Sequence, residues 1–166
     1  MAAGNWHEAQ WFDSVDDTTL PSHYEGCFGC GPERPAGLGV VAHLDGAEIT
    51  TTHVFSPLHS GAPGITHGGL VATLVDEMLG YVLYLVRSLG VTRRLEIDYL
   101  KPVLLGVPYD VRARVDRRDG RKVFVSCEAL GADGVMVFKA NGLFILVPAE
   151  HFALGTASLG SGPAAL

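Results

Sequence analysis

The sequence predicts an α+β domain in which about six antiparallel strands wrap around one long central helix. One run, residues 67–86, is apolar on nearly every face, and a helix of that kind is enclosed by the rest of its protein. Strand-like segments lie on both sides of this run, and Asp-Gly dipeptides at residues 45–46, 119–120 and 133–134 separate neighbouring segments. Asp-Gly favours a tight hairpin turn, because glycine tolerates positive φ. Strands joined by such turns must be antiparallel, since parallel neighbours need long crossovers.

Three parts are expected along the 166 residues, a length that suits one domain. Residues 1–37 lack a clean period and include a stretch rich in Gly and Pro, so they should form an N-terminal arm packing on the domain. Residues 38–148 should form the domain itself. Residues 149–166 are rich in Ala, Gly and Ser with little to bury, and they should be a flexible tail.

The strands of the domain are expected in two groups around the helix. Residues 38–55 hold two β-rich runs about the first Asp-Gly turn. Residues 57–64 contain two prolines and two glycines, which should exclude regular structure before the helix. The four later strands are expected at residues 92–101, 109–117, 122–130 and 135–147.

Composition excludes several classes of partner and location. The formal net charge of -6 argues against nucleic acid, because binding phosphates needs a basic face. Three cysteines cannot all pair, and residues 1–12 lack the basic start and apolar core of a secretion signal, so a cytoplasmic location is expected. Residues 65–86 approach membrane-spanning length, but Asp76 and Glu77 would each disfavour insertion by roughly 2.5–3.5 kcal/mol. No membrane association is expected.

Several motifs follow one another in order. His67-Gly68-Gly69 is followed by Asp76, nine positions after the histidine, and then by Thr92-x-x-Leu-x-Ile-x-Tyr-x-x-Pro102; Cys-Phe-Gly-Cys-Gly-Pro precedes them at residues 27–32. Together the motifs resemble the PaaI-type acyl-CoA thioesterases, over residues 27–148. The resemblance implies the hotdog fold and hydrolysis of an acyl-CoA thioester to free acid and coenzyme A, with no cofactor. It also implies a homodimer or a dimer of dimers, with active sites along the interface between paired helices.

The start of the helix suits such a reaction. Unpaired N–H groups and the positive end of the helix dipole face outward at Gly68 and Gly69. They can hold the thioester oxygen, which gains negative charge during hydrolysis, and glycine permits the close approach. An isolated Gly pair is more simply a flexible junction, but the acid Asp76 nearby favours catalysis. The alternative for Asp76 is a buried acid satisfied by Thr73 or by backbone.

The position of Asp76 predicts a site shared between two subunits. It lies seven residues after Gly69, on the same helix face but about 10 Å further along the axis. A carboxylate that activates water must reach that water while Gly68 and Gly69 hold the carbonyl. One helix cannot easily supply both groups, so Asp76 is expected to come from the helix of a second subunit.

Other residues near the helix are candidates with alternatives. Thr92 matches a position where related enzymes carry a hydroxyl that helps to hold the attacking water; an ordinary strand threonine is the alternative. His67 is either a base or, as we favour, a residue that fixes the loop by a hydrogen bond to backbone. Gly80 lies on the face of Asp76 and leaves room for an acyl group. The resemblance fails at Gly61, where several members carry Asn or Gln to help bind the thioester or water.

Two further features concern charge and metal. Coenzyme A is strongly anionic, and the cations of one predicted hairpin are the best local counter-charge for its phosphates, although a solvated turn is the alternative. Cys27-x-x-Cys30 has the spacing of half a zinc site or of a redox pair, but no second pair follows, so no metal is expected. The hairpin cations are Arg117, Arg118, Arg121 and Lys122.

Two other functions share the predicted fold, a non-catalytic acyl-CoA sensor and an enoyl-CoA hydratase or dehydratase. Asp76 speaks against a sensor, while the spacing of His67 and Asp76 does not exclude a hydratase. Neither the acyl group nor the choice between dimer and tetramer follows from the sequence, because side-chain packing across the interface decides both.

Overall fold

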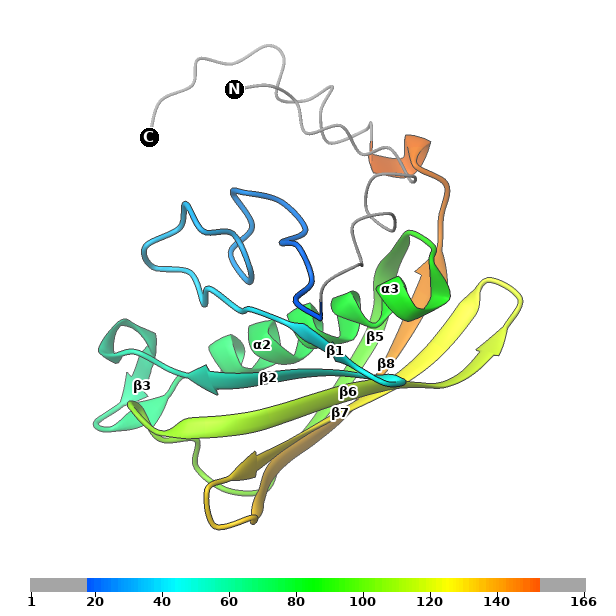
Figure 1. Cartoon of the computed structure of the whole chain (residues 1–166). Coiled ribbons are helices and arrows are strands. Elements are labelled where there is room, and N and C mark those ends of the chain that lie inside the picture. The colour runs from blue at the N-terminus through cyan, green and yellow to red at the C-terminus, as the bar shows by residue number, and fades with distance from the viewer. Residues whose placement is uncertain (1–17, 153–166) are drawn as a thin grey trace.

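The computed structural model describes residues 18–152, in which one antiparallel sheet curls around one helix (Figure 1). The six strands lie in the order β1-β2-β6-β7-β8-β5. The helix is α2, Gly68–Tyr81, and Val82 joins it to the short α3, Leu83–Val86. The predicted fold class is therefore confirmed. The strands are β1 (His43–Asp45), β2 (Glu48–Val54), β5 (Gly90–Tyr99), β6 (Pro108–Asp119), β7 (Lys122–Gly131) and β8 (Met136–Leu146).

Three hairpins turn at the predicted Asp-Gly dipeptides. Gly46, Gly120 and Gly134 have φ of 61°, 56° and 72°, which most residues with a Cβ avoid. These turns join β1 to β2, β6 to β7 and β7 to β8. Strand β5 follows the helix instead and pairs with β8. Its other edge has no neighbouring strand within residues 18–152.

Helix α2 lies between the sheet and the N-terminal arm (Figure 1). Leu74, Val75, Met78 and Leu79 are fully buried and belong to one core cluster with residues of the strands. By length and composition alone, Gly68–Val86 is apolar enough to cross a membrane. A core helix commonly has this composition, and the burial of these side chains accounts for it here.

The segment before the helix is more regular than the sequence predicts. Pro57–His59 form one turn of 3-10 helix, η1, and Ser60–Ala62 (β3) pairs with Ile65–Thr66 (β4) in a small second sheet. The expectation of no regular structure at residues 57–64 is wrong. Pro57 stands in the first helical turn, where its missing N–H is not needed, and Gly64, with φ of 74°, lies in the turn of the small hairpin.

The described part of the arm, residues 18–37, lies over α2 on the side away from the sheet (Figure 1). Leu20 N–H donates to Ala42 O at 2.8 Å, and Leu20 and Cys30 are buried in the core cluster. Residues 1–17 of the expected arm and residues 153–166 of the expected tail lie outside the described residues. The predicted domain boundaries stay predictions.

Candidate active site

The start of α2 presents one backbone N–H group to the surface. His67 caps the helix: its backbone is extended, and its Nδ1 accepts a hydrogen bond from Gly69 N–H at 2.9 Å. This is the kind of backbone contact that the sequence favours for His67. Gly68 is exposed, and its N–H has no protein acceptor among the described residues. Of the two glycines, Gly68 is therefore the one whose donor is available to a ligand.

Tyr99, at the end of β5, contacts the same turn but is not among the predicted site residues. Its hydroxyl donates to Gly68 O at 2.9 Å, and 51% of the residue is exposed. Desolvation raises the pKa of Tyr99, so the hydroxyl stays protonated at neutral pH and can donate this hydrogen bond to Gly68 O. Tyr99 is part of the motif that begins at Thr92, and its exposed position at a strand end is the signal that would have identified it.

Asp76 is held by Thr92. The Thr92 hydroxyl, on β5, donates to Asp76 Oδ1 at 2.8 Å. The register of β5 against β8 shifts between Thr92 and Arg94, and a β-bulge of this kind re-aims the neighbouring side chains. Thr73, the alternative partner for Asp76, donates instead to Gly69 O at 3.0 Å. A carboxylate accepts several hydrogen bonds, so Asp76 keeps acceptor sites for a water molecule.

Asp76 and Thr92 line one cavity together with Gly80. A Cβ at Gly80 would lie 3.5 Å from His23 Cε1, so the glycine leaves the cavity wider on that side. The structure therefore brings together three of the predicted site residues, Asp76, Thr92 and Gly80. The rest of the wall is mainly apolar and includes Leu83, Tyr84, Leu89, Gly90 and Phe144.

The helix start and the carboxylate are not brought together within one chain. Asp76 lies eight positions after Gly68, and the rise along the helix axis between them is about 12 Å at 1.5 Å per residue. A carbonyl group bound by Gly68 N–H is thus out of reach of a water molecule bound by Asp76 on the same helix. The two halves of the predicted site lie along one helix, each with its own partner from β5.

The β6–β7 hairpin carries the predicted cations, all of them exposed. Arg118 pairs with Val123, and both Val123 and Thr92 pair with Phe144 on β8. Arg118 and Thr92 thus stand in one row across the sheet, three strands apart, or about 14 Å at the usual strand spacing. The cationic hairpin and Thr92 occupy the same end of the sheet. The four cations are Arg117, Arg118, Arg121 and Lys122.

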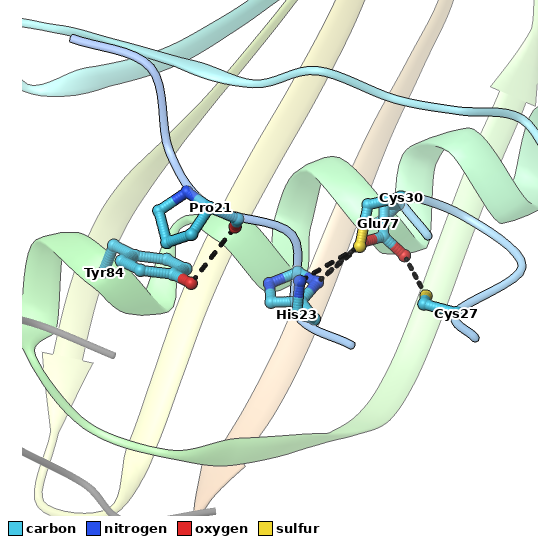
Figure 2. Close-up of polar contacts among 6 residues, drawn as sticks. All are labelled: Pro21, His23, Cys27, Cys30, Glu77 and Tyr84. Carbon is cyan, nitrogen blue, oxygen red and sulfur yellow. Dashed lines mark hydrogen bonds and ion pairs between the residues drawn. The ribbon is translucent and has the colours of Figure 1, made fainter. Parts of the chain in front are cut away.

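Glu77, the residue after Asp76, faces the arm (Figure 2). His23 Nδ1 lies 2.6 Å from Glu77 Oε1, and the Cys27 thiol donates to Glu77 Oε2 at 3.4 Å. Burial opposes the charge of Glu77, but the hydrogen bond and charge of His23, with the Cys30 and Cys27 thiols, lower its pKa below the ordinary value. Glu77 is therefore a carboxylate in a polar cluster under the arm. The sequence did not predict this cluster, because His23 and Glu77 are 54 residues apart.

Comparisons with curated proteins identify relatives. Residues 63–137 match the family model of the thioesterase superfamily. Acyl-coenzyme A thioesterase THEM4 of Bos taurus is 32% identical over 123 residues, which are 72% of this chain and 51% of that protein. THEM4 of Xenopus laevis is 38% identical over 91 residues, 54% of this chain and 40% of that protein. A putative esterase of Pseudomonas aeruginosa is 34% identical over 91 residues, 53% of this chain and 67% of its own length. The chain spans about half the length of the THEM4 relatives.

Solved structures share the architecture. A thioesterase superfamily protein aligns with a TM-score of 0.69 and 29% identity, over 73% of this chain and 60% of that chain. The PaaI protein of E. coli aligns with a TM-score of 0.62 and 19% identity, over 67% and 81% of the two chains, and supports the fold alone. One sheet wrapped around one helix, with these neighbours, defines a hotdog fold. The chain belongs to the thioesterase superfamily, and the predicted resemblance is confirmed.

Proposed function

We propose that the chain hydrolyses acyl-CoA thioesters to a free acid and coenzyme A. The observation that carries the proposal is the Asp76 carboxylate, which Thr92 holds on the wall of a largely apolar cavity. The relatives in Bos taurus and Xenopus laevis are named acyl-coenzyme A thioesterases. A thioesterase-like protein of Streptococcus pneumoniae with the same fold was solved with coenzyme A. These names support the same chemistry here.

In this reaction Asp76 is the general base. It takes a proton from a water molecule as the water oxygen attacks the thioester carbonyl carbon. The carbonyl oxygen becomes negatively charged, and Gly68 N–H donates a hydrogen bond to it. The carbon–sulfur bond then breaks, and the coenzyme A thiolate takes up the proton. Thr92 fixes the orientation of Asp76 throughout, and the cavity beside Gly80 holds the acyl chain.

A second copy of the chain completes the site. Because Gly68 and Asp76 of one helix are about 12 Å apart, the carbonyl group held by Gly68 is attacked by water at Asp76 of the partner subunit. Strand β5 supports pairing, since one edge of its ten residues has no neighbour in the described part of the chain. Tyr99, Leu100 and Leu104 are exposed, and a homodimer would cover these side chains. A dimer of dimers meets the same requirement.

The cationic β6–β7 hairpin binds the phosphates of coenzyme A in this proposal. The chain has a formal net charge of -6, so an anionic ligand needs a local cationic group. Arg118 stands in the same row of the sheet as Thr92, which places the hairpin at the end of the sheet where the thioester reacts. Guanidinium groups match phosphate geometry.

Thiol release from short, long and aromatic acyl-CoAs tests the proposal. The native protein should release thiol, and Asp76→Asn should be slower by roughly 10²–10⁴-fold, the usual contribution of a general base. Asp110→Asn is a matched control, because Asp110 Oδ1 also accepts from a threonine, Thr52, at 2.7 Å but lies outside the cavity. It should keep the native rate.

Two outcomes would contradict hydrolysis. Native protein that binds acyl-CoA without releasing thiol would be a sensor. Turnover of enoyl-CoA in place of thiol release would indicate a hydratase or dehydratase.

A further inference from the structure

Three side chains that commonly bind metal, His23, Cys30 and Glu77, meet where the arm crosses α2, and the Cys27 thiol lies beside Glu77. We propose that His23, Cys27, Cys30 and Glu77 bind one zinc ion, which fastens the arm to the central helix. The proposed thioester chemistry uses none of these four side chains as a reacting group, although the cluster adjoins the cavity that contains Asp76.

The four side chains converge from two parts of the chain (Figure 2). His23 Nδ1, Cys30 Sγ and a Glu77 carboxylate oxygen all lie within 4.8 Å of one another. His23 Nδ1 is 3.6 Å from Cys30 Sγ, and Cys27 Sγ is 3.4 Å from Glu77 Oε2. Cys30 is 5% exposed, and the side chains of His23 and Glu77 are 17% and 10% exposed. The cluster is therefore largely shielded from water.

The donor set and its spacing suit zinc. Two thiolates, an imidazole and a carboxylate are typical ligands of a four-coordinate zinc ion. Bond lengths of roughly 2.0–2.3 Å put the ligand atoms of a tetrahedron roughly 3.3–3.8 Å apart. The separations of 3.6 Å and 3.4 Å fall in this range. Cys27 lies outside the group of ligand atoms that are all within 4.8 Å of one another, so its thiol has to move inward to complete the tetrahedron. The His23–Glu77 contact of 2.6 Å is a hydrogen bond, which has to lengthen by roughly 0.7 Å when zinc replaces the shared proton.

Backbone hydrogen bonds hold the Cys30 sulfur atom and the turn between the two cysteines. His23 N–H donates to Cys30 Sγ at 3.1 Å, and Gly31 N–H donates to Cys27 O at 2.9 Å, which closes the turn between the cysteines. A zinc ion binds cysteine as the thiolate, so binding at this site releases the thiol protons of both cysteines.

Two glycines allow the turn to lie against the helix. A Cβ at Gly29 would collide with the Glu77 carboxyl group, and a Cβ at Gly31 would collide with the Cys27 backbone. A solvated surface loop has no need of such close approach. The sequence of residues 27–31 therefore fits the helix at Glu77 in particular.

The histidine and the carboxylate favour a metal over a redox pair. A redox-active Cys-x-x-Cys pair needs only its two sulfur atoms, whereas here an imidazole and a carboxylate meet the same sulfurs. His23 and Glu77 also line the cavity that contains Asp76. A bound ion would thus fix the arm as one wall of that cavity. The sequence predicts no metal, because the two further ligands follow neither a second Cys pair nor a His pair.

The zinc content of the reduced, full-length protein tests the proposal. Native protein should bind about one zinc ion per chain, and cobalt(II) in its place should give sulfur-to-cobalt charge-transfer absorption. Cys30→Ser and Glu77→Gln should each weaken zinc binding by more than roughly 100-fold, the upper cost of losing a residue that only orients a ligand. Cys127→Ser is the matched control, because it removes a buried thiol of β7 outside the cluster. It should bind zinc as the native protein does.

The measurement on the native protein decides whether the proposal stands, so a variant that fails to fold leaves the test intact. Native protein that takes up neither stoichiometric zinc nor cobalt with sulfur charge transfer overturns the proposal. Zinc binding that survives Cys30→Ser but is lost in Cys127→Ser overturns it as well. Thiol release is measured separately, so failure of the zinc site does not count against hydrolysis.

Discussion

Asp76 and Glu77 are adjacent on α2 and line the same cavity, yet the two carboxylates have different partners. Asp76 faces a cavity, and its partner is one neutral hydroxyl group, that of Thr92. Glu77 faces the arm and is surrounded by His23 and two thiols. One helical step of about 100° separates them. The different environments of the two acids are the basis for the two roles proposed above, water activation for Asp76 and fastening of the arm for Glu77.

The two sides of α2 differ in how accessible they are to a ligand. In the proposed reaction the open side, with Gly68, Asp76 and Gly80, binds water and an acyl chain, and it therefore needs an accessible backbone donor and an accessible carboxylate. The arm side, centred on Glu77, is closed by residues 18–37. Substitutions on the open side should therefore change turnover, and those on the arm side should change stability.

After Asp76→Asn, Gly68→Pro should have the largest effect on the open side. Proline suits the first helical position and needs an extended residue before it, which His67 is, with φ of -64° and ψ of 129°. The substitution removes the N–H donor, so thiol release should fall by roughly 10²–10³-fold, while circular dichroism should show native helix content.

Gly68→Ala is the control for that variant. It keeps the N–H, and its Cβ would lie 3.8 Å from the Tyr99 ring, an ordinary contact. It should lose far less activity than Gly68→Pro. Equal losses in the two variants would show that the shape of the turn matters and the donor does not.

Thr92→Val should have a smaller effect. It removes the hydrogen bond to Asp76, and a hydrogen bond to a charged group contributes about 1.5–3 kcal/mol, or roughly 10–100-fold in rate. Thr92→Ser keeps the hydroxyl and should lie near the native rate in the same thiol-release assay. A Thr92→Val protein as active as the native one would remove Thr92 from the site.

Gly29→Ala and Gly80→Ala should have opposite effects on the free energy of unfolding, because they lie on different sides of α2. A Cβ at Gly29 would displace Glu77 from its partners, so urea unfolding should show a loss of about 1–3 kcal/mol. Gly80→Ala meets only an ordinary contact with His23 and gains about 0.8–1.0 kcal/mol of helix propensity, yet it should slow bulky acyl-CoAs more than short ones. Native stability in Gly29→Ala would show that the arm does not rest on Glu77.

Local signals predicted most of the fold. The Asp-Gly turns depend only on the φ of Gly46, Gly120 and Gly134, and the apolar helix is recognisable from its own composition. The prediction for residues 57–64 is wrong because proline and glycine can also begin or connect regular elements: Pro57 starts η1, and Gly64 turns the β3–β4 hairpin.

The sequence predicts the site only for residues that lie on one continuous segment, the start and first turns of α2. His67, Gly68 and Asp76 are spaced along a single helix, so their order was visible in the sequence. The contact of Tyr99 with Gly68 joins residues 31 apart, and that of His23 with Glu77 joins residues 54 apart. Such contacts depend on how a strand and the arm pack on α2. The engagement of Gly69 N–H by His67 depends on a side-chain orientation that the sequence does not specify.

Complementation between Gly68→Pro and Asp76→Asn tests the shared site most directly. Each variant alone should release little thiol. In a mixed dimer, Gly68 of the Asp76→Asn copy faces the intact Asp76 of the other copy, so one of the two sites is complete. Purified mixed dimers should recover roughly half of the native activity. If they stay as inactive as the two variants, Gly68 and Asp76 do not act across a subunit interface, and the site proposed for this chain is wrong.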